Sequence, residues 1–132
     1  MSAALIVQSF ERASELCPDL TPLVYQRLFR EEPGLEEFFV LDRTGAVKGN
    51  MLSWLIRSIL DFVGDRAYGQ NLIQAEALHH DGYGVSKEQF ARIFGTLART
   101  LEDILGDEWA SYSAAWSGRI ADLDRIVVEA GQ

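Results

Sequence analysis

The chain has 132 residues, of which 48% are hydrophobic, and its formal net charge is −8. This is the size of one ordinary domain, and we expect a single domain over residues 1–132. The acidic balance argues against a nucleic-acid partner, because phosphate binding needs clustered Lys and Arg. No apolar run approaches the roughly 20 residues that span a bilayer, and no basic flank marks a signal peptide. We therefore expect a cytoplasmic protein without a membrane partner.

Apolar residues recur three to four positions apart through most of the chain, which is the spacing of a helix with one buried face. Val24 and Leu28 follow this spacing, and so do Leu52, Ile56, Ile59 and Val63. No stretch of alternating apolar and polar residues is long enough to predict a strand. The fold class is therefore predicted to be all-α. The expected helices are 2–16, 20–32, 47–64, 69–80, 86–105 and 108–129, with a short helical turn at 34–39.

Two sets of residues predict where the later helices begin and end. Ser86 followed by Gln89 is a capping-box pattern, which starts a helix directly after the corner at 82–84. Gly106 suits the end of a helix, and Asp107 can cap the one that follows. The last two helices should then form an antiparallel pair.

The only two histidines, His79 and His80, are adjacent at the end of an apolar helix. Consecutive helical positions differ by about 100°, which disfavours a metal site built from both rings. A single inward imidazole has two interpretations: a hydrogen-bonded core residue, or the ligand of a haem iron in an apolar cavity. The chain offers residues to line such a cavity: Phe29, Phe38, Phe39, Leu52, Ile56, Val85, Phe90 and Ile93.

Three ordered segments resemble the bacterial single-domain haemoglobins and the globin domain of flavohaemoglobins. His80-Asp81-Gly82-Tyr83-Gly84-Val85 resembles the proximal histidine and glycine corner of that family. Leu20–Phe29 resembles its second helix, whose tyrosine donates to a gas ligand, and Tyr25 falls on that position. Pro33–Phe39 resembles the turn whose last phenylalanine packs on the haem. The resemblance covers nearly the whole chain.

The resemblance implies a globin-like fold of about six to eight helices around a haem pocket. It implies haem b as cofactor, His80 as the iron ligand, and reversible binding of oxygen, nitric oxide or carbon monoxide, for storage or sensing. The residues it implies around the haem are Tyr25, Phe29, Phe39, Lys48, Leu52, Ile56, His80, Val85, Phe90 and Ile93.

Two other functions stay open at this point. One is detoxification of nitric oxide or oxygen, an enzymatic role that needs a separate reductase as partner. The other is a haemless globin fold that acts as a sensor or interaction module. A gas-binding protein is favoured over an enzyme, and a homodimer is left open.

Three positions depart from the family pattern. Counting back from His80 places Lys48 and Leu52 at the distal positions, where the family has Gln or His and then Leu. We expect Lys48 to pair with a haem propionate rather than to ligate iron. Glu76 either points to solvent or accepts a hydrogen bond from His80. Ile120 replaces the tyrosine that supports the proximal histidine in flavohaemoglobins, which weakens the case for strong oxidative chemistry.

Overall fold

A computed structural model describes residues 2–132, and within that range the chain is helical with no strand. This confirms the all-α fold class. The α-helices are α1 (Ser2–Leu16), α2 (Thr21–Glu31), α3 (Ala46–Val63), α4 (Gly69–Gly82), α5 (Lys87–Leu105) and α6 (Ser113–Val128). Two 3₁₀ helices, η1 (Pro33–Phe39) and η2 (Gly106–Ser111), join them. None of the helices between residues 2 and 132 has the length and apolar character needed to cross a bilayer.

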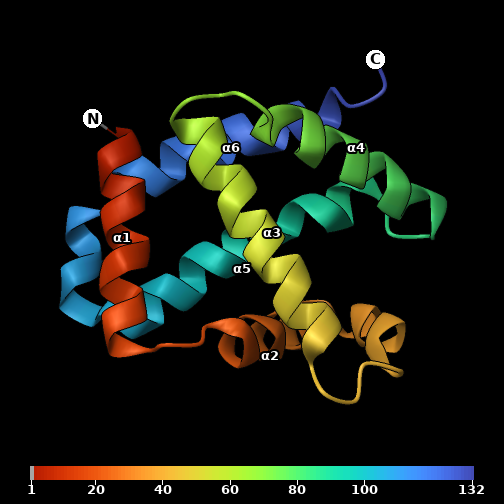
Figure 1. The fold of residues 1–132 in the computed structure, drawn as a ribbon, viewed down its shortest axis with the longest axis horizontal. Helices are drawn as coiled ribbons and strands as arrows, with labels where there is room; N and C mark the ends of the chain where they lie inside the picture. Colours follow the sequence, from red (N-terminus) through yellow and green to blue (C-terminus); the bar gives the residue numbers. More distant parts are fainter. Residues whose placement is uncertain (1) are drawn as a thin grey trace.

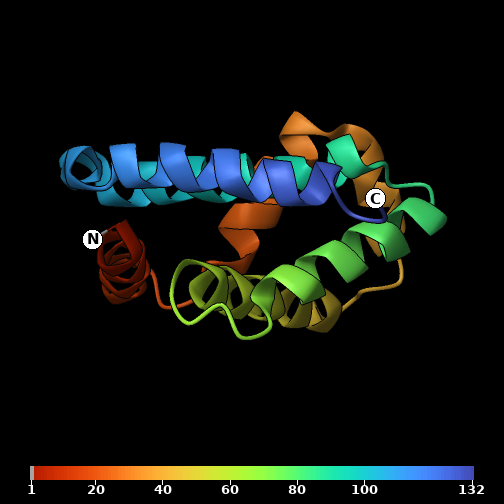
Figure 2. The same ribbon diagram turned by 90° about the horizontal axis from the view of Figure 1, so that it is seen from above.

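The helices form two layers. Helices α5 and α6 lie side by side and run in opposite directions, as predicted (Figure 1). Helices α3 and α4 pack together in the second layer (Figure 2), and α3 crosses over α5 (Figure 1). Helices α2 and η1 close one end of the molecule, where α2 packs against α5. The first part of α3 and the last part of α4 therefore face each other across the end that α2 and η1 close.

One hydrophobic core joins the two layers. Trp116 of α6 is fully buried in it, and its ring meets Phe10 of α1 edge-on at 5.4 Å between centroids. The indole N–H donates to Ser9 Oγ at 2.9 Å, and that hydroxyl donates to the carbonyl of Ile6 at 2.7 Å. Each buried polar atom in this chain of contacts is thus satisfied, as a stable core requires. Trp116 is a packing residue.

The boundaries of the later helices follow the predicted signals in part. The capping box at the start of α5 is confirmed: Ser86 Oγ accepts from the Gln89 backbone N–H, and the Gln89 side chain accepts from the Ser86 N–H. The prediction that the last helix starts at residue 108 was wrong. A 3₁₀ helix follows Gly106, and α6 begins only at Ser113, so Asp107 does not cap it.

Helix α2 is tied to α5 through Glu31. Its carboxylate accepts hydrogen bonds from Arg99 Nε and Nη2, both at 2.9 Å, and from Thr96 Oγ1 at 2.7 Å. Arg27 lies one turn earlier on α2 with its Nη1 at 3.4 Å from the same carboxylate. Arg99 contributes most to lowering the pKa of Glu31 to about 2. These contacts hold the end of α2 against the middle of α5.

The corner between α3 and α4 depends on Asp61 and Gly69. The Asp61 carboxylate accepts the backbone N–H groups of Ala67, Tyr68 and Gly69 at 3.2, 2.9 and 2.6 Å, which caps the start of α4. Gly69 lies directly against α3: a Cβ at this position would be 2.2 Å from the carbonyl oxygen of Ser58. Only glycine lets α4 start this close to α3.

Gly69→Ala should destabilise the protein by about 3 kcal/mol, at the upper end of overpacking costs, because the clash is with backbone and cannot be relieved by a side-chain rotation. Gly118→Ala is the matched control. Gly118 is exposed within α6 and its Cβ would meet nothing within 4 Å. Alanine at position 118 should raise the free energy of unfolding by about 0.5–1 kcal/mol. Urea unfolding measures both, and an unchanged midpoint for Gly69→Ala would contradict the close approach.

Candidate functional site

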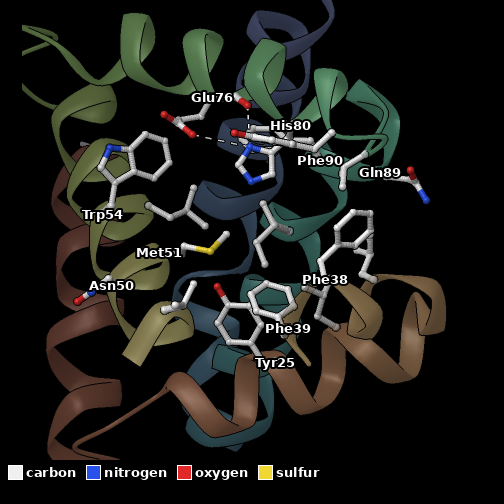
Figure 3. Close-up of a pocket in the computed structure, with 17 residues that line it drawn as sticks. Tyr25, Phe38, Phe39, Asn50, Met51, Trp54, Glu76, His80, Gln89 and Phe90 are labelled. Atoms are coloured by element: carbon white, nitrogen blue, oxygen red, sulfur yellow. Dashed lines mark hydrogen bonds and ion pairs between the residues drawn. The ribbon is translucent and has the colours of Figure 1, made fainter. Parts of the chain in front are cut away.

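A cavity of about 470 Å³ lies at the end of the molecule where α2, η1, α3, α4 and α5 meet (Figure 3). This volume is in the usual range for small-molecule and cofactor sites, and most of the lining is apolar. The lining residues are Tyr25, Leu28, Leu35, Phe38, Phe39, Val47, Asn50, Met51, Trp54, Leu55, Glu76, His80, Tyr83, Val85, Gln89, Phe90 and Ile93.

His80 sits in the last turns of α4 with its ring at one side of the cavity (Figure 3). Its Nδ1 lies 2.7 Å from the backbone carbonyl oxygen of Glu76. A carbonyl only accepts hydrogen bonds, so Nδ1 carries a proton, and in the neutral ring the lone pair is then on Nε2. Figure 3 shows this second nitrogen turned into the cavity. A neutral imidazole held through its N–H is the form that binds a metal.

The two histidines are separated by the helix as expected. The His79 side chain is 67% exposed and that of His80 is 26% exposed. The Phe90 ring of α5 packs against the His80 ring, with centroids 4.9 Å apart and planes at 54°. His80 is thus held both by a hydrogen bond along its own helix and by an aromatic contact from the next one.

The Glu76 carboxylate does not accept the hydrogen bond from His80 that was one of its two expected roles. Its carboxylate is partly exposed and lines the cavity, with Oε2 at 3.8 Å from His80 Nδ1 and Oε1 at 3.4 Å from His79 Nδ1. The short hydrogen bond to His80, however, goes to the Glu76 backbone carbonyl. The carboxylate is therefore a nearby negative charge, and the carbonyl is what orients the ring.

Tyr25 of α2 lies across the cavity from His80 (Figure 3). Its ring is buried and packs with those of Phe29 and Phe39, at centroid distances of 5.9 and 5.4 Å. The hydroxyl points into the cavity and has no hydrogen-bonding partner among residues 2–132. Burial, with a smaller effect of the Asp42 carboxylate, raises the pKa of Tyr25 to about 12. The phenol therefore keeps its proton and is a free donor.

The face of α3 that lines the cavity differs by one helical position from the face expected from the sequence. Leu52 and Ile56, which were expected to line the cavity, do not reach it: Leu52 is buried in the core, and Ile56 packs against that core. The cavity is instead lined by a neighbouring face of α3, which we call the pocket stripe: Val47, Asn50, Met51, Trp54 and Leu55. Helix α3 carries two apolar stripes, and the sequence does not say which one faces His80.

Lys48 and Phe29 were also expected at the cavity, and neither lines it. Both contribute to a separate hollow that shares only Phe39 with the cavity. Lys48 Nζ lies 3.6 Å from Asp42 Oδ2 and 5.8 Å from the centroid of the Phe39 ring. The lysine is therefore held by Asp42 and lies outside the lining of the cavity that contains His80. The Phe29 ring packs against the rings of Tyr25 and Phe39.

Asp42 explains this orientation of α3. Its carboxylate accepts the backbone N–H groups of Val47 and Lys48 at 3.1 and 3.0 Å, and so caps the first turn of the helix. The same carboxylate pairs with the Lys48 ammonium. Since one aspartate makes all three contacts, it draws position 48 to its own side and leaves position 47 at the cavity.

The remaining sequence-predicted residues meet at the cavity. Val85, Phe90 and Ile93 line it together with Tyr25, Phe39 and His80. Phe38, Val47 and Tyr83 are more than half exposed and form its mouth. Its polar lining consists of Tyr25, Asn50, Glu76, His80, Tyr83 and Gln89, and among residues 2–132 no lysine or arginine reaches it.

The donor set fits haem better than a bare metal ion. Within residues 2–132 no group of three or more His, Cys, Asp or Glu side chains is placed to hold a metal. A single imidazole nitrogen facing an apolar cavity is, however, what a haem iron needs, because the porphyrin supplies the other ligands.

Comparisons of the chain with protein-family models, with curated proteins and with solved structures found no match. The functional inference therefore rests on the cavity and on the residues it brings together.

The Tyr25 phenol should make the folded protein sensitive to alkaline pH. A phenol in the unfolded chain ionises near pH 10, whereas burial holds the Tyr25 proton to about pH 12. The contribution of Tyr25 to the free energy of unfolding is complete below about pH 10 and is lost as pH rises through 12. Between these pH values only the unfolded state releases the phenol proton, which favours unfolding. Relative to Tyr25→Phe, wild type should lose on the order of 2 kcal/mol of unfolding free energy between about pH 9 and 12. Denaturant unfolding of both proteins at several pH values measures this, and parallel curves would contradict it.

Proposed function

We propose that this chain is a haem-binding protein of the globin type that reversibly binds a diatomic gas such as oxygen, nitric oxide or carbon monoxide. The observation that carries the proposal is His80: its Nδ1–H is held by a carbonyl 2.7 Å away, and its free Nε2 faces an apolar cavity. Haem would supply an iron with one position for the imidazole and one for the gas.

The other lining residues have roles that follow from their placement. Phe39, Val85, Phe90 and Ile93 present apolar surface against which a porphyrin can pack. Removing that much apolar surface from water is the main source of affinity for such a group. Since no cation lines the cavity, the propionates would lie at the mouth, near the neutral polar groups of Asn50, Tyr83 and Gln89. This replaces the expected pairing of a propionate with Lys48.

Tyr25 would provide the polar contact on the gas side. Its hydroxyl is the free donor opposite His80 (Figure 3). The η1 and α3 residues that line the cavity are largely apolar and include Phe39, Val47, Met51 and Leu55. A hydrogen bond to a ligand that carries partial negative charge favours oxygen over less polar gases. The role we propose is binding; turnover of nitric oxide would require electrons from a separate reductase.

A second candidate function, a haemless globin fold that serves as a sensor or interaction module, is favoured by one observation. The Glu76 carboxylate lines the cavity, and no lysine or arginine among residues 2–132 joins it there. A cavity of this charge is less suited to a doubly anionic cofactor than one lined by cations. Haem loading distinguishes the two functions.

His80→Ala should abolish axial ligation of haem, whereas His79→Ala should not, because the two side chains differ in exposure and only His80 faces the cavity. Purified protein is mixed with haemin, and absorbance is recorded in oxidised, reduced and carbon monoxide forms. We expect the Soret band of a histidine-ligated haem in wild type and His79→Ala and its loss or displacement in His80→Ala. A wild type without a Soret band, or a His80→Ala spectrum like that of wild type, would overturn the proposal.

Tyr25→Phe should speed oxygen dissociation from the haem-loaded protein. Loss of one neutral hydrogen bond of about 1 kcal/mol corresponds to roughly a fivefold faster rate. Stopped-flow replacement of oxygen by carbon monoxide measures it. Dissociation of carbon monoxide, which accepts hydrogen bonds poorly, is the internal control and should change less. Equal oxygen dissociation rates in the two proteins would remove the donor role of Tyr25.

A further inference from the structure

Met51 occupies the middle of the pocket stripe, one helical turn after Val47 and one before Leu55. Its side chain extends into the cavity, and Figure 3 shows its sulfur in the space between the His80 ring on one side and the Tyr25 hydroxyl on the other. The expected occupant of this part of α3 was Leu52, an aliphatic residue without a lone pair. The position facing His80 therefore holds a group that can act as a ligand.

Among the pocket-stripe residues, only Met51 and Asn50 have side-chain atoms with lone pairs suited to a metal. Asn50 is exposed, and Figure 3 shows its amide directed away from the cavity centre. The Met51 thioether is neutral, so it binds a metal without losing a proton and without placing a charge in an apolar space. Tyr25 differs in this respect, because a phenol ligates iron as its anion, which burial disfavours.

We propose that the Met51 sulfur is the second axial ligand of the haem iron, opposite His80, whenever no gas is bound. The proposal rests on the haem-binding function proposed above. A thioether opposite a histidine is a stable axial pair for haem iron. Met51 is only partly buried, and its unbranched side chain has three rotatable bonds, so it can leave the iron when a gas arrives.

Ligation by Met51 has two consequences for the protein. Gas binds only to the fraction of molecules in which the sulfur is detached, so the apparent affinity is reduced by that fraction. A thioether also raises the reduction potential of haem iron, which favours the ferrous form that binds oxygen and carbon monoxide. Met51 would thus lower gas affinity and keep the iron reduced.

The direct test uses the unmodified sequence. The chain has two methionines, Met1 and Met51. Haem-loaded protein labelled with [¹³C-methyl]methionine is reduced under argon and examined by NMR. A methyl group on an axial sulfur lies above the porphyrin ring, so its proton signal should move far upfield. Carbon monoxide should return it toward the usual methionine range, because the gas replaces the sulfur. The signal is assigned to Met51 by its disappearance in Met51→Leu.

Two variants test the effect on coordination and affinity. Met51→Leu keeps the apolar volume and removes the sulfur, and Ser53→Ala changes an exposed residue of α3 that does not line the cavity. Absorbance and electron paramagnetic resonance should show six-coordinate low-spin haem in wild type and Ser53→Ala, and high-spin haem in Met51→Leu. If about a tenth of wild-type molecules have the sulfur detached, Met51→Leu should bind carbon monoxide about tenfold more tightly. Its reduction potential should fall.

The outcomes separate the two proposals. A wild type with no Soret band would overturn the haem-binding function itself. A haem-loaded wild type whose methionine methyl signals stay in the usual range, or whose spin state matches that of Met51→Leu, would overturn the role of Met51 and leave haem binding by His80 intact. Whether any methionine methyl signal moves upfield is read from wild type alone, so this measurement can overturn the role of Met51 even if Met51→Leu does not fold.

Discussion

The corner at Asp61 and Gly69 determines where the cavity lies. Helix α3 carries the pocket stripe near its start, and α4 carries His80 near its end, so the two face each other only if the helices turn back closely on one another. Asp61 supplies the hydrogen bonds that start α4, and the missing side chain of Gly69 allows contact with the Ser58 carbonyl. Burial of the core then holds both helices in this arrangement. The geometry of the site is therefore set at the end of α3 that lies farthest from it.

Several features could be predicted from the sequence because they depend on residues that are close together along the chain. The capping box at Ser86 and the helical period that defines the all-α class are of this kind. Tyr25 and His80 were expected at one cavity because of the family resemblance of their two segments, and both line the cavity in the structure. Local patterns alone did not bring these two residues together.

Other features depend on contacts that a linear pattern does not contain. The face that α3 presents to the cavity follows from the cap that Asp42 provides and from its pairing with Lys48, and both apolar stripes of the helix satisfy the same period. The partner of His80 Nδ1 is a backbone carbonyl, which every residue possesses, so no residue type marks it. The 3₁₀ helix after Gly106 similarly delays α6 without a distinctive sequence.

The two apolar stripes of α3 have different roles: one packs in the core, and the pocket stripe lines the cavity. Leu52, Ile59 and Val63 are almost fully buried in the core, as is Leu55 of the pocket stripe, whereas Val47 is about half exposed and Met51 is partly buried. Substitutions at positions 47 and 51 therefore change the chemistry of the cavity with little loss of packing. Substitutions at positions 52 and 59 weaken the packing of the core and leave the cavity lining unchanged. A lineage carrying this fold could thus exchange one ligand preference for another through single substitutions, without first passing through an unstable ancestor.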